Sequence, residues 1–307
     1  MLRRLLWTVP LIFGITLLTF ALFSLSPTDP AEVAARVNVM VPTPELLAKL
    51  RHEFGLDLPF WQRYLNWLGS AVAGDFGRSF ITKRTVVDEF AMALPATLTL
   101  TLTAAALMLA VSVPLGVLSG LREGSRLDVT IRGVVFILSS FAPFWVGLLL
   151  ISLFSLELGW LPTYGMKGEG AWILPTVTLA IGYSPTYVRL IRTAVISASH
   201  ENWVVAARAQ GMSSGRLTWR LLVNALRPSI TALGMSIPRL MAGAFVVESL
   251  FAWPGIGYLC VRAIFNRDIP VVQAYLLLMA TLFVLSNFLS DVLVLWLDPQ
   301  KRQGGMR

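Results

Sequence analysis

Long stretches without a charged side chain alternate with short polar segments along this chain. Most of these stretches reach the roughly 20 apolar residues that a helix needs to cross a bilayer. A further stretch, 229–250, has the same length and hydrophobicity, although it contains Arg239 and Glu248. The uncharged stretches are 5–28, 90–121, 133–156, 170–188 and 269–290. The pattern therefore predicts an all-α polytopic membrane protein with six transmembrane helices.

The composition agrees with this prediction. Of the 307 residues, 56% are hydrophobic and 14% are charged, whereas soluble proteins average roughly 25% charged residues. The net charge of +8 could by itself indicate a nucleic-acid partner. Most of the excess charge lies beside the predicted spans, where membrane topology explains it. We therefore expect the lipid bilayer, and no nucleic acid, around this chain.

Lys and Arg beside the spans set the expected orientation, because cytoplasmic flanks are enriched in both. The basic flanks are 3–4, 122–132, 189–227 and 301–307, which places both termini in the cytoplasm. The first apolar stretch is longer than the roughly 7–15 residues of a signal-peptide core, so we expect it to remain as a span. The predicted organisation is a first transmembrane helix at 1–28, an exported helical loop at 29–92, a five-helix core at 93–300 and a cytoplasmic tail at 301–307.

The exported loop carries helical signals of its own. Thr43 followed by Pro44 is typical of a helix start, with a capping hydroxyl and a proline in the first turn. A second helix is expected to begin near Pro59, with an aromatic stripe across 60–68, and Gly74–Ser79 is typical of a turn. The apolar stripes are interpreted as packing against each other and the membrane surface, or alternatively as a rim that receives a substrate-delivering partner.

A polar, arginine-rich segment at 197–228, named here the coupling segment, separates the fourth and fifth predicted spans. Small side chains at Ala206, Ala207 and Ala209 would let a short helix lie close in a groove of another protein. Gly211 can adopt the positive φ that ends such a helix. The segment is therefore predicted to be a docking surface for another subunit.

Several separated motifs together resemble the dipeptide, oligopeptide and nickel permease family of ABC importers. They include Glu201 with the alanine pair and Gly211, and Glu248 ahead of the segment 251–257. The others are Gly55-Leu56-Asp57, Gly74-Asp75-Phe76-Gly77, Asn266-Arg267-Asp268 and Asp298-Pro299. Within the family, residues 251–255 with 263–268 and 270–273 look closest to the nickel and metal-opine (metallophore) branch.

The resemblance implies a type I ABC importer permease fold in a bacterial inner (plasma) membrane, with the exported loop in the periplasm. It also implies a companion permease in a heterodimer, two ATPase subunits and a periplasmic substrate-binding protein. None of the four lysines follows a glycine, so the chain has no Gly-x-x-x-x-Gly-Lys phosphate loop. ATP and Mg²⁺ are therefore expected on the ATPase partners, and this chain is expected to be neither an enzyme nor the holder of a cofactor.

The coupling segment supplies the residues that the resemblance predicts to contact an ATPase. These are Glu201, Ala206, Ala207, Arg208, Gly211 and Arg216. Each charged residue also has a simpler interpretation. A carboxylate at Glu201 suits a helix N-terminus, and Arg208 and Arg216 satisfy the positive-inside rule without any partner.

Met235, Arg239 and Glu248 in the fifth span are candidates for the translocation path. If that span begins near residue 229, Arg239 lies roughly 15 Å along it. A cation at that depth should face a cavity or a partner, so we expect Arg239 to meet an anionic group of the cargo or an acid of the companion permease. Glu248 falls on the opposite helix face and is expected to brace the break at 251–257 or to act in gating.

The predicted cargo is nickel or another transition metal, carried in chelated form by ATP-driven alternating access. His52, His200 and Cys260 are too few and too scattered for a metal site, so the chelator would supply the ligands. A dipeptide or oligopeptide is the alternative cargo. A six-span channel and a membrane hydrolase are more distant alternatives; the Gly-x-Ser-x-Gly pattern at 211–215 lacks the preceding strand that a hydrolase needs.

Overall fold

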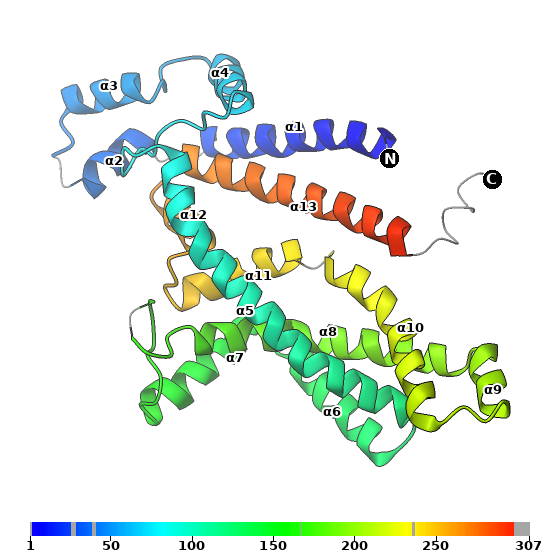
Figure 1. Cartoon of the computed structure of the whole chain (residues 1–307). Helices are drawn as coiled ribbons and strands as arrows, with labels where there is room; N and C mark the ends of the chain where they lie inside the picture. Colours follow the sequence, from blue (N-terminus) through cyan, green and yellow to red (C-terminus); the bar gives the residue numbers. More distant parts are fainter. Residues whose placement is uncertain (1, 26–28, 39–40, 167, 235–236, 298–307) are drawn as a thin grey trace. The chain divides into compact units, whose positions relative to one another are not determined.

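The computed structural model describes residues 2–25, 29–38, 41–166, 168–234 and 237–297 (Figure 1). Every named element in these ranges is a helix, and the described β pairing is one isolated bridge between Arg78 and Thr85. The predicted all-helical class is therefore confirmed. The helices are α1 (Leu2–Ser24), α2 (Pro30–Val37), α3 (Pro44–Glu53), α4 (Phe60–Val72), α5 (Val86–Leu121), α6 (Arg126–Ser140), α7 (Pro143–Leu150), the π-helix η1 (Ile151–Glu157), α8 (Ile173–Ser199), α9 (Asn202–Ala209), α10 (Ser214–Gly234), α11 (Ile237–Leu250), α12 (Ile256–Phe265) and α13 (Ile269–Leu297).

The chain divides into two compact units, each described here by itself. The first combines the described parts of 1–97 with 254–284, and the second combines 98–253 with the described residues after 284. Helices α5 and α13 each contribute to both units.

In the first unit, α2 and α3 pack on each other through Ala31, Ala35 and Leu50. The Thr43 hydroxyl accepts a hydrogen bond from the Leu46 backbone N–H at 3.3 Å, which confirms the predicted helix start. Helix α2 has the same signature, with Asp29 as cap before a proline. Sequence analysis did not predict this helix, although the signal for it was present.

The aromatic stripe of α4 packs against α1. Tyr64 is fully buried, and its hydroxyl lies 2.9 Å from that of Thr16 on α1. Its ring makes edge contacts with Phe13 and Phe20. Trp61, in contrast, is 60% exposed, so only part of the predicted stripe is used for internal packing.

The loop between α4 and α5 contains the predicted turn and is held in place by the buried Asp268. Gly74 and Gly77 both have positive φ, and Asp75 accepts the Gly77 backbone N–H, as expected for the predicted turn. Further along, the carboxylate of Asp268 accepts the Ser79 hydroxyl and the Phe80 backbone N–H. The loop is therefore tied to the segment between α12 and α13.

In the second unit, α5 and α8 approach each other at two glycines. A Cβ on Gly116 would lie 2.8 Å from the Cβ of Ile191, and one on Gly120 would lie 2.8 Å from that of Val195. Real Cβ atoms do not come this close, so only glycine permits the contact. Two small residues four positions apart thus allow α5 and α8 to pack closely.

The third predicted span, 133–156, is bent rather than continuous. Its residues belong to α6, α7 and η1, and the chain turns by 95° between α6 and the following helical stretch. Pro143 occupies the first turn of α7. Proline has no backbone N–H and disfavours helix in the residue before it, which explains the break.

The fifth predicted span, 229–250, is helical in its described residues. Helix α10 begins in the coupling segment at Ser214 and runs to Gly234, and α11 covers Ile237–Leu250. Residues 235 and 236 lie outside the described ranges. The depth of Arg239 along this span therefore stays a prediction.

By length and composition, one helix in the described ranges, α5, is long and apolar enough to cross a bilayer. The bent pair of α6 with the stretch 143–157 makes a second if it counts as one span. Shorter apolar helices cover Phe13–Leu22, Ile256–Phe265 and Ile269–Leu285. The count of six spans and the orientation of the termini stay predictions.

Candidate functional site

The coupling segment folds as a helix–turn–helix connection between α8 and α10 (Figure 1). Glu201 is the N-cap residue of α9, with extended backbone dihedrals. Gly211 closes the helix with φ +76°, and the Met212 backbone N–H donates to the Ala207 carbonyl at 3.1 Å. The predicted short helix and its glycine stop are both confirmed.

The inner face of α9 is held by a core from three helices. Val204 and Ala207 are buried. Their neighbours in this cluster come from α8 and α10: Ile191, Val195, Ala198, Leu217, Leu221 and Ala225. Ala207 therefore packs inward within its own chain, which differs from the expectation that it faces a partner.

The outer face of α9 and the start of α10 is open. Ala206, Arg208, Gly211 and Arg216 are exposed, and neither arginine pairs with a carboxylate in the described part of the chain. Two large apolar side chains share this exposure, Val205 at 64% and Trp219 at 69%. Small, cationic and apolar groups are thus all exposed on α9 and the start of α10, and we call this set of residues the α9 face.

Glu201 is exposed at the edge of the α9 face. Its carboxylate accepts the indole N–H of Trp203 at 2.6 Å, and it makes no capping hydrogen bond to a backbone N–H in the first turn of α9. The side chain is therefore not a hydrogen-bonding cap, although its charge lies at the helix N-terminus. A hollow of about 630 Å³ adjoins Glu201 and is lined by residues of α8 and α10, among them Arg189 and Asn224.

A buried ion pair lies in the same unit, between α6 and α8. Asp128 is fully buried in the first turn of α6. The Arg192 guanidinium donates to both of its oxygens, Nε to Oδ1 at 2.8 Å and a terminal nitrogen to Oδ2 at 2.9 Å. Ser119 of α5 and the Gly124 backbone N–H donate to the same carboxylate. Three helices therefore meet at this one acid.

The pKa of Asp128 is lowered and the pKa of Arg192 is raised by their contact. Hydrogen bonds from Arg192, then from Ser119 and Gly124, hold the pKa of Asp128 well below its usual range, although burial acts in the other direction. The hydrogen bonds to Asp128 raise the pKa of Arg192. Sequence analysis treated Arg192 only as a topology signal and missed this pair. The available signal was Asp128 itself, the one acid between Glu123 and Glu157.

The path candidates are only partly placed by the structure. Arg239 is exposed, and its carbonyl accepts the Tyr183 hydroxyl at 2.7 Å. Met235 lies outside the described residues. Glu248 is fully buried near the end of α11, and its carbonyl accepts the Trp253 backbone N–H at 2.8 Å. The predicted helix break is confirmed, because α11 ends at Leu250 and α12 begins at Ile256.

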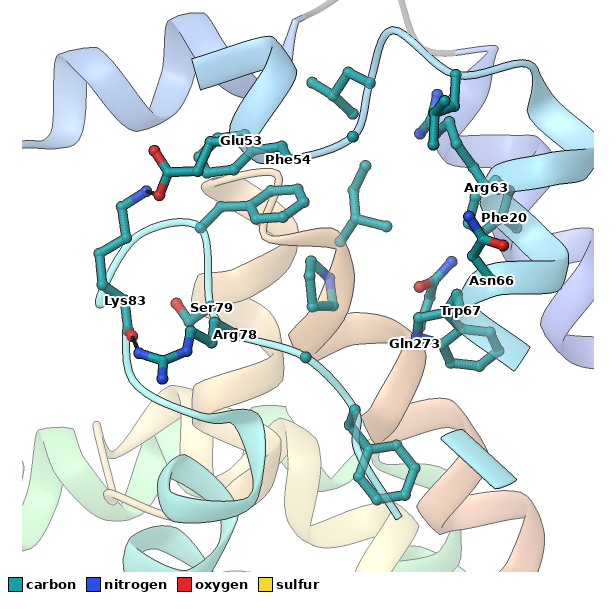
Figure 2. A pocket seen from close by; sticks show the side chains of 18 residues that line it. Phe20, Glu53, Phe54, Arg63, Asn66, Trp67, Arg78, Ser79, Lys83 and Gln273 are labelled. Atoms are coloured by element: carbon teal, nitrogen blue, oxygen red, sulfur yellow. Dashed lines mark hydrogen bonds and ion pairs between the residues drawn. The ribbon is translucent and has the colours of Figure 1, made fainter. Parts of the chain in front are cut away.

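A cavity of about 630 Å³ lies within the first unit (Figure 2). Helix α4, the loops at 53–58 and 76–83, and the start of α13 line it. In Figure 2, Glu53, Phe54, Arg78, Ser79 and Lys83 lie on one side, and Phe20, Arg63, Asn66, Trp67 and Gln273 lie on the other. Sequence analysis did not bring these residues together.

Clusters of three or more His, Cys, Asp or Glu side chains that could hold a metal ion are absent from the described ranges.

Comparison with known proteins gives two family matches that together cover most of the chain. Residues 112–303 match the family described as "Binding-protein-dependent transport system inner membrane component", and residues 1–101 match its N-terminal counterpart. The chain is 36% identical to the metal-staphylopine import system permease protein CntB of Staphylococcus aureus, covering 99% of this chain and 98% of the relative. It is also 36% identical to the oligopeptide transport system permease protein AppB of Bacillus subtilis, covering 97% of each.

A solved structure supports the fold. The chain is similar to a chain of the inward-facing MetNI methionine ABC transporter with a TM-score of 0.58 and 20% identity, covering 68% of this chain and 95% of the other.

Proposed function

We propose that this chain, which belongs to the family of inner-membrane components of binding-protein-dependent transport systems, imports a chelated transition metal. Members of this family are membrane-embedded ABC importer permeases, and they work with ATPase and substrate-binding partners. In this proposal the chain has six spans with both termini in the cytoplasm. It pairs with a companion permease and two ATPase subunits, and it receives cargo from a periplasmic binding protein.

The α9 face is the observation that carries the coupling part of the proposal. Val204 and Ala207 fix α9 to α8 and α10 from the inside, so a push on the outer face is passed to both longer helices. The exposed Arg208 and Arg216 can pair with carboxylates of an ATPase, and Trp219 can enter an apolar pocket. Aromatic and arginine side chains are the usual anchors of protein interfaces.

ATP is hydrolysed on the partner subunits, since this chain has no phosphate loop. ATP binding brings the two ATPases together, their movement displaces the coupling segments, and the permease pair switches between inward and outward access.

Similarity to a metal-staphylopine permease over almost the whole chain supports the cargo assignment. The MetNI structure carries no weight here, because a resemblance at 20% identity concerns the fold. Arg239, exposed on α11, is the candidate contact for an anionic group of the chelate. Substitution Arg239→Met should raise the transport Michaelis constant for anionic chelates more than for neutral cargo. Unchanged constants and unchanged choice among chelates would remove Arg239 from the path.

A peptide cargo is the second candidate, because the oligopeptide permease AppB is equally similar. The deciding experiment measures nickel accumulation in wild type, a clean deletion and the complemented strain, with and without added chelators. Growth on dipeptides as the amino-acid source is followed in parallel. Loss of chelator-dependent nickel uptake with intact dipeptide growth supports the metal cargo. Loss of dipeptide growth with unchanged nickel supports the peptide cargo and overturns the metal proposal.

A further inference from the structure

The cavity in the first unit has the size of a small-molecule site. Its volume of about 630 Å³ falls within the roughly 300–1,000 Å³ that is usual for ligand pockets. It is built from α4, two loops and the start of α13 (Figure 2). Its described lining includes no residue of the α9 face and neither Arg239 nor Glu248. The sites assigned above therefore do not account for it.

One wall of the cavity presents hydrogen-bond donors. Arg63, Asn66 and Trp67 are spaced at i, i+3 and i+4 on α4, so they share one helix face. Gln273, from the start of α13, lies on the same side of the cavity (Figure 2). Two turns of α4 and one turn of α13 thus place four N–H donor groups together.

Two of the four donors at this wall lack acceptors. The indole nitrogen of Trp67 and the amide nitrogen of Gln273 are both buried without a hydrogen-bond partner among the described residues. Gln273 is only 2% exposed. A buried donor left unpaired costs the full desolvation of that group. Two such groups beside one cavity indicate a missing acceptor.

Arg63 adds positive charge to the same wall. Its guanidinium lies 5.2 Å from the centre of the Phe20 ring, and it pairs with no carboxylate of the described residues. It is partly buried, and burial lowers the pKa of its guanidinium. An anionic acceptor at this place would offset that burial.

The opposite wall is largely aromatic, and its Lys83 and Glu53 pair with each other. Phe54 stacks on Phe80 with ring centroids 4.0 Å apart. The Lys83 ammonium lies 4.4 Å from the Phe54 ring centre and 3.1 Å from a Glu53 carboxylate oxygen. This wall therefore offers an apolar surface, together with the Arg78 guanidinium, which donates to the Lys83 carbonyl at 3.5 Å.

We propose that this cavity binds the carboxylate group of the transported molecule, with Arg63 and Asn66 holding the carboxylate and the apolar part lying against Phe54. The Gln273 amide, which is covered from solvent in this structure, reaches the carboxylate after rotation about its side-chain bonds. The inference rests on the proposed function in that the ligand is the cargo. Chelators and peptides both carry carboxylates, so the site has the same chemistry for either cargo.

The test measures binding to the complete transporter in nanodiscs, without ATP and without the binding protein, by equilibrium dialysis. The probes are trialanine, trialanine amide and nickel citrate. Trialanine or nickel citrate should bind, and trialanine amide should bind at least about tenfold more weakly because it lacks the charged acceptor. Binding of trialanine indicates a peptide as the source of the carboxylate, and binding of nickel citrate indicates a chelate. Equal binding of trialanine and its amide, with no binding of nickel citrate, would overturn the inference.

Two variants test whether the wall formed by α4 and α13 binds the carboxylate. Arg63→Gln should weaken binding about tenfold, and Gln273→Met about threefold, while Lys49→Gln should leave it unchanged. Lys49 is exposed on α3 and lies outside the cavity. Gln273→Met should not lower the thermal midpoint of the transporter, because it removes a buried amide nitrogen that has no hydrogen-bond partner among the described residues. Wild-type affinity in both Arg63→Gln and Gln273→Met would show that the carboxylate does not bind here.

ATP-driven uptake in proteoliposomes with the binding protein separates this inference from the proposed function. Uptake of a probe that shows no binding to the ATP-free transporter would reject the cavity and leave the permease function standing. A probe that binds the cavity but is never taken up would reject both its assignment as cargo and the inference as stated.

Discussion

Two buried aspartates, Asp128 in the second unit and Asp268 in the first, respond to burial in opposite ways. The Arg192 guanidinium and two neutral donors surround Asp128 and keep its pKa below the usual range. Asp268 receives neutral donors, the Ser79 hydroxyl and the Phe80 backbone N–H, and burial raises its pKa. At Asp128 the hydrogen bonds from a cation outweigh desolvation, whereas at Asp268 desolvation, aided by the nearby Glu89 charge, outweighs hydrogen bonds from neutral groups. The negative charge of Asp128 is therefore the property that its site requires, whereas the site of Asp268 requires the two oxygens as hydrogen-bond acceptors.

Removing the charge at Asp128 should have the largest effect. Asp128→Ala leaves Arg192 buried without its acid and should destabilise the second unit by about 3 kcal/mol or more. We expect a large drop in the thermal midpoint of the purified permease and low expression. Asp57→Ala, which changes an exposed acid in the first unit, is the control and should behave like wild type. A near-normal midpoint for Asp128→Ala would mean that the pair adds little to stability.

Asparagine should be tolerated better at Asp268 than at Asp128. Asp268→Asn keeps one carbonyl acceptor for its two donors, so we expect a loss of about 1 kcal/mol. Asp75→Asn is a matched control, because the exposed Asp75 also accepts a backbone N–H, from Gly77 at 2.9 Å. Thermal midpoints of Asp268→Asn, Asp128→Asn and the control, measured together, should fall in the order control, Asp268, Asp128. The reverse order for the two buried sites would contradict the comparison.

The pH dependence of stability should differ in sign between the two acids. The raised pKa of Asp268 means that its folded state holds a proton more readily than the unfolded chain. Its contribution is therefore fully present below the usual Asp pKa of about 3.9 and is lost as pH rises through the raised value. The stability of wild type relative to Asp268→Asn should fall as pH rises above about 4. Thermal midpoints across this range would check it, and a difference that grows with pH would exclude the raised pKa.

For Asp128 the lowered pKa gives the opposite sign. Its contribution is present above the usual pKa and is lost only as pH falls through the lowered value. The midpoint difference between wild type and Asp128→Asn should therefore stay constant from neutral pH down to about pH 4. A difference that already shrinks between neutral pH and pH 5 would contradict the lowered pKa.

The smallest effect is expected at the second arginine beside Asp128. Arg132 lies 3.5 Å from Asp128 and its side chain is 52% exposed, so Arg132→Gln should cost at most about 0.5 kcal/mol. Arg192→Gln in the same assay serves as the strong counterpart. Equal losses for the two arginines would show that the geometry of the Arg192 pair is unimportant.

Features that depend on neighbouring residues could be predicted from the sequence. The Thr43 cap, the Gly211 stop and the helix break after Leu250 each follow from local chemistry, and all three are present.

Features that depend on distant residues could not be predicted. Asp128 and Arg192 are 64 positions apart, and Trp67 meets Gln273 at one cavity only because of tertiary packing. A single sequence shows which residues are polar and not which of them meet.

The two glycines of α5 have a mechanical consequence. With 27 residues, α8 is about 40 Å long, and it runs directly to Glu201 at the start of α9. Backbone contact at Gly116 and Gly120 leaves no compressible side-chain layer between α8 and α5, while Arg192 fastens α8 to α6. We therefore expect a force on α9 to shift the parts of α5, α6 and α8 around these contacts as one stiff block, because the contacts at the two glycines leave no soft layer that could deform.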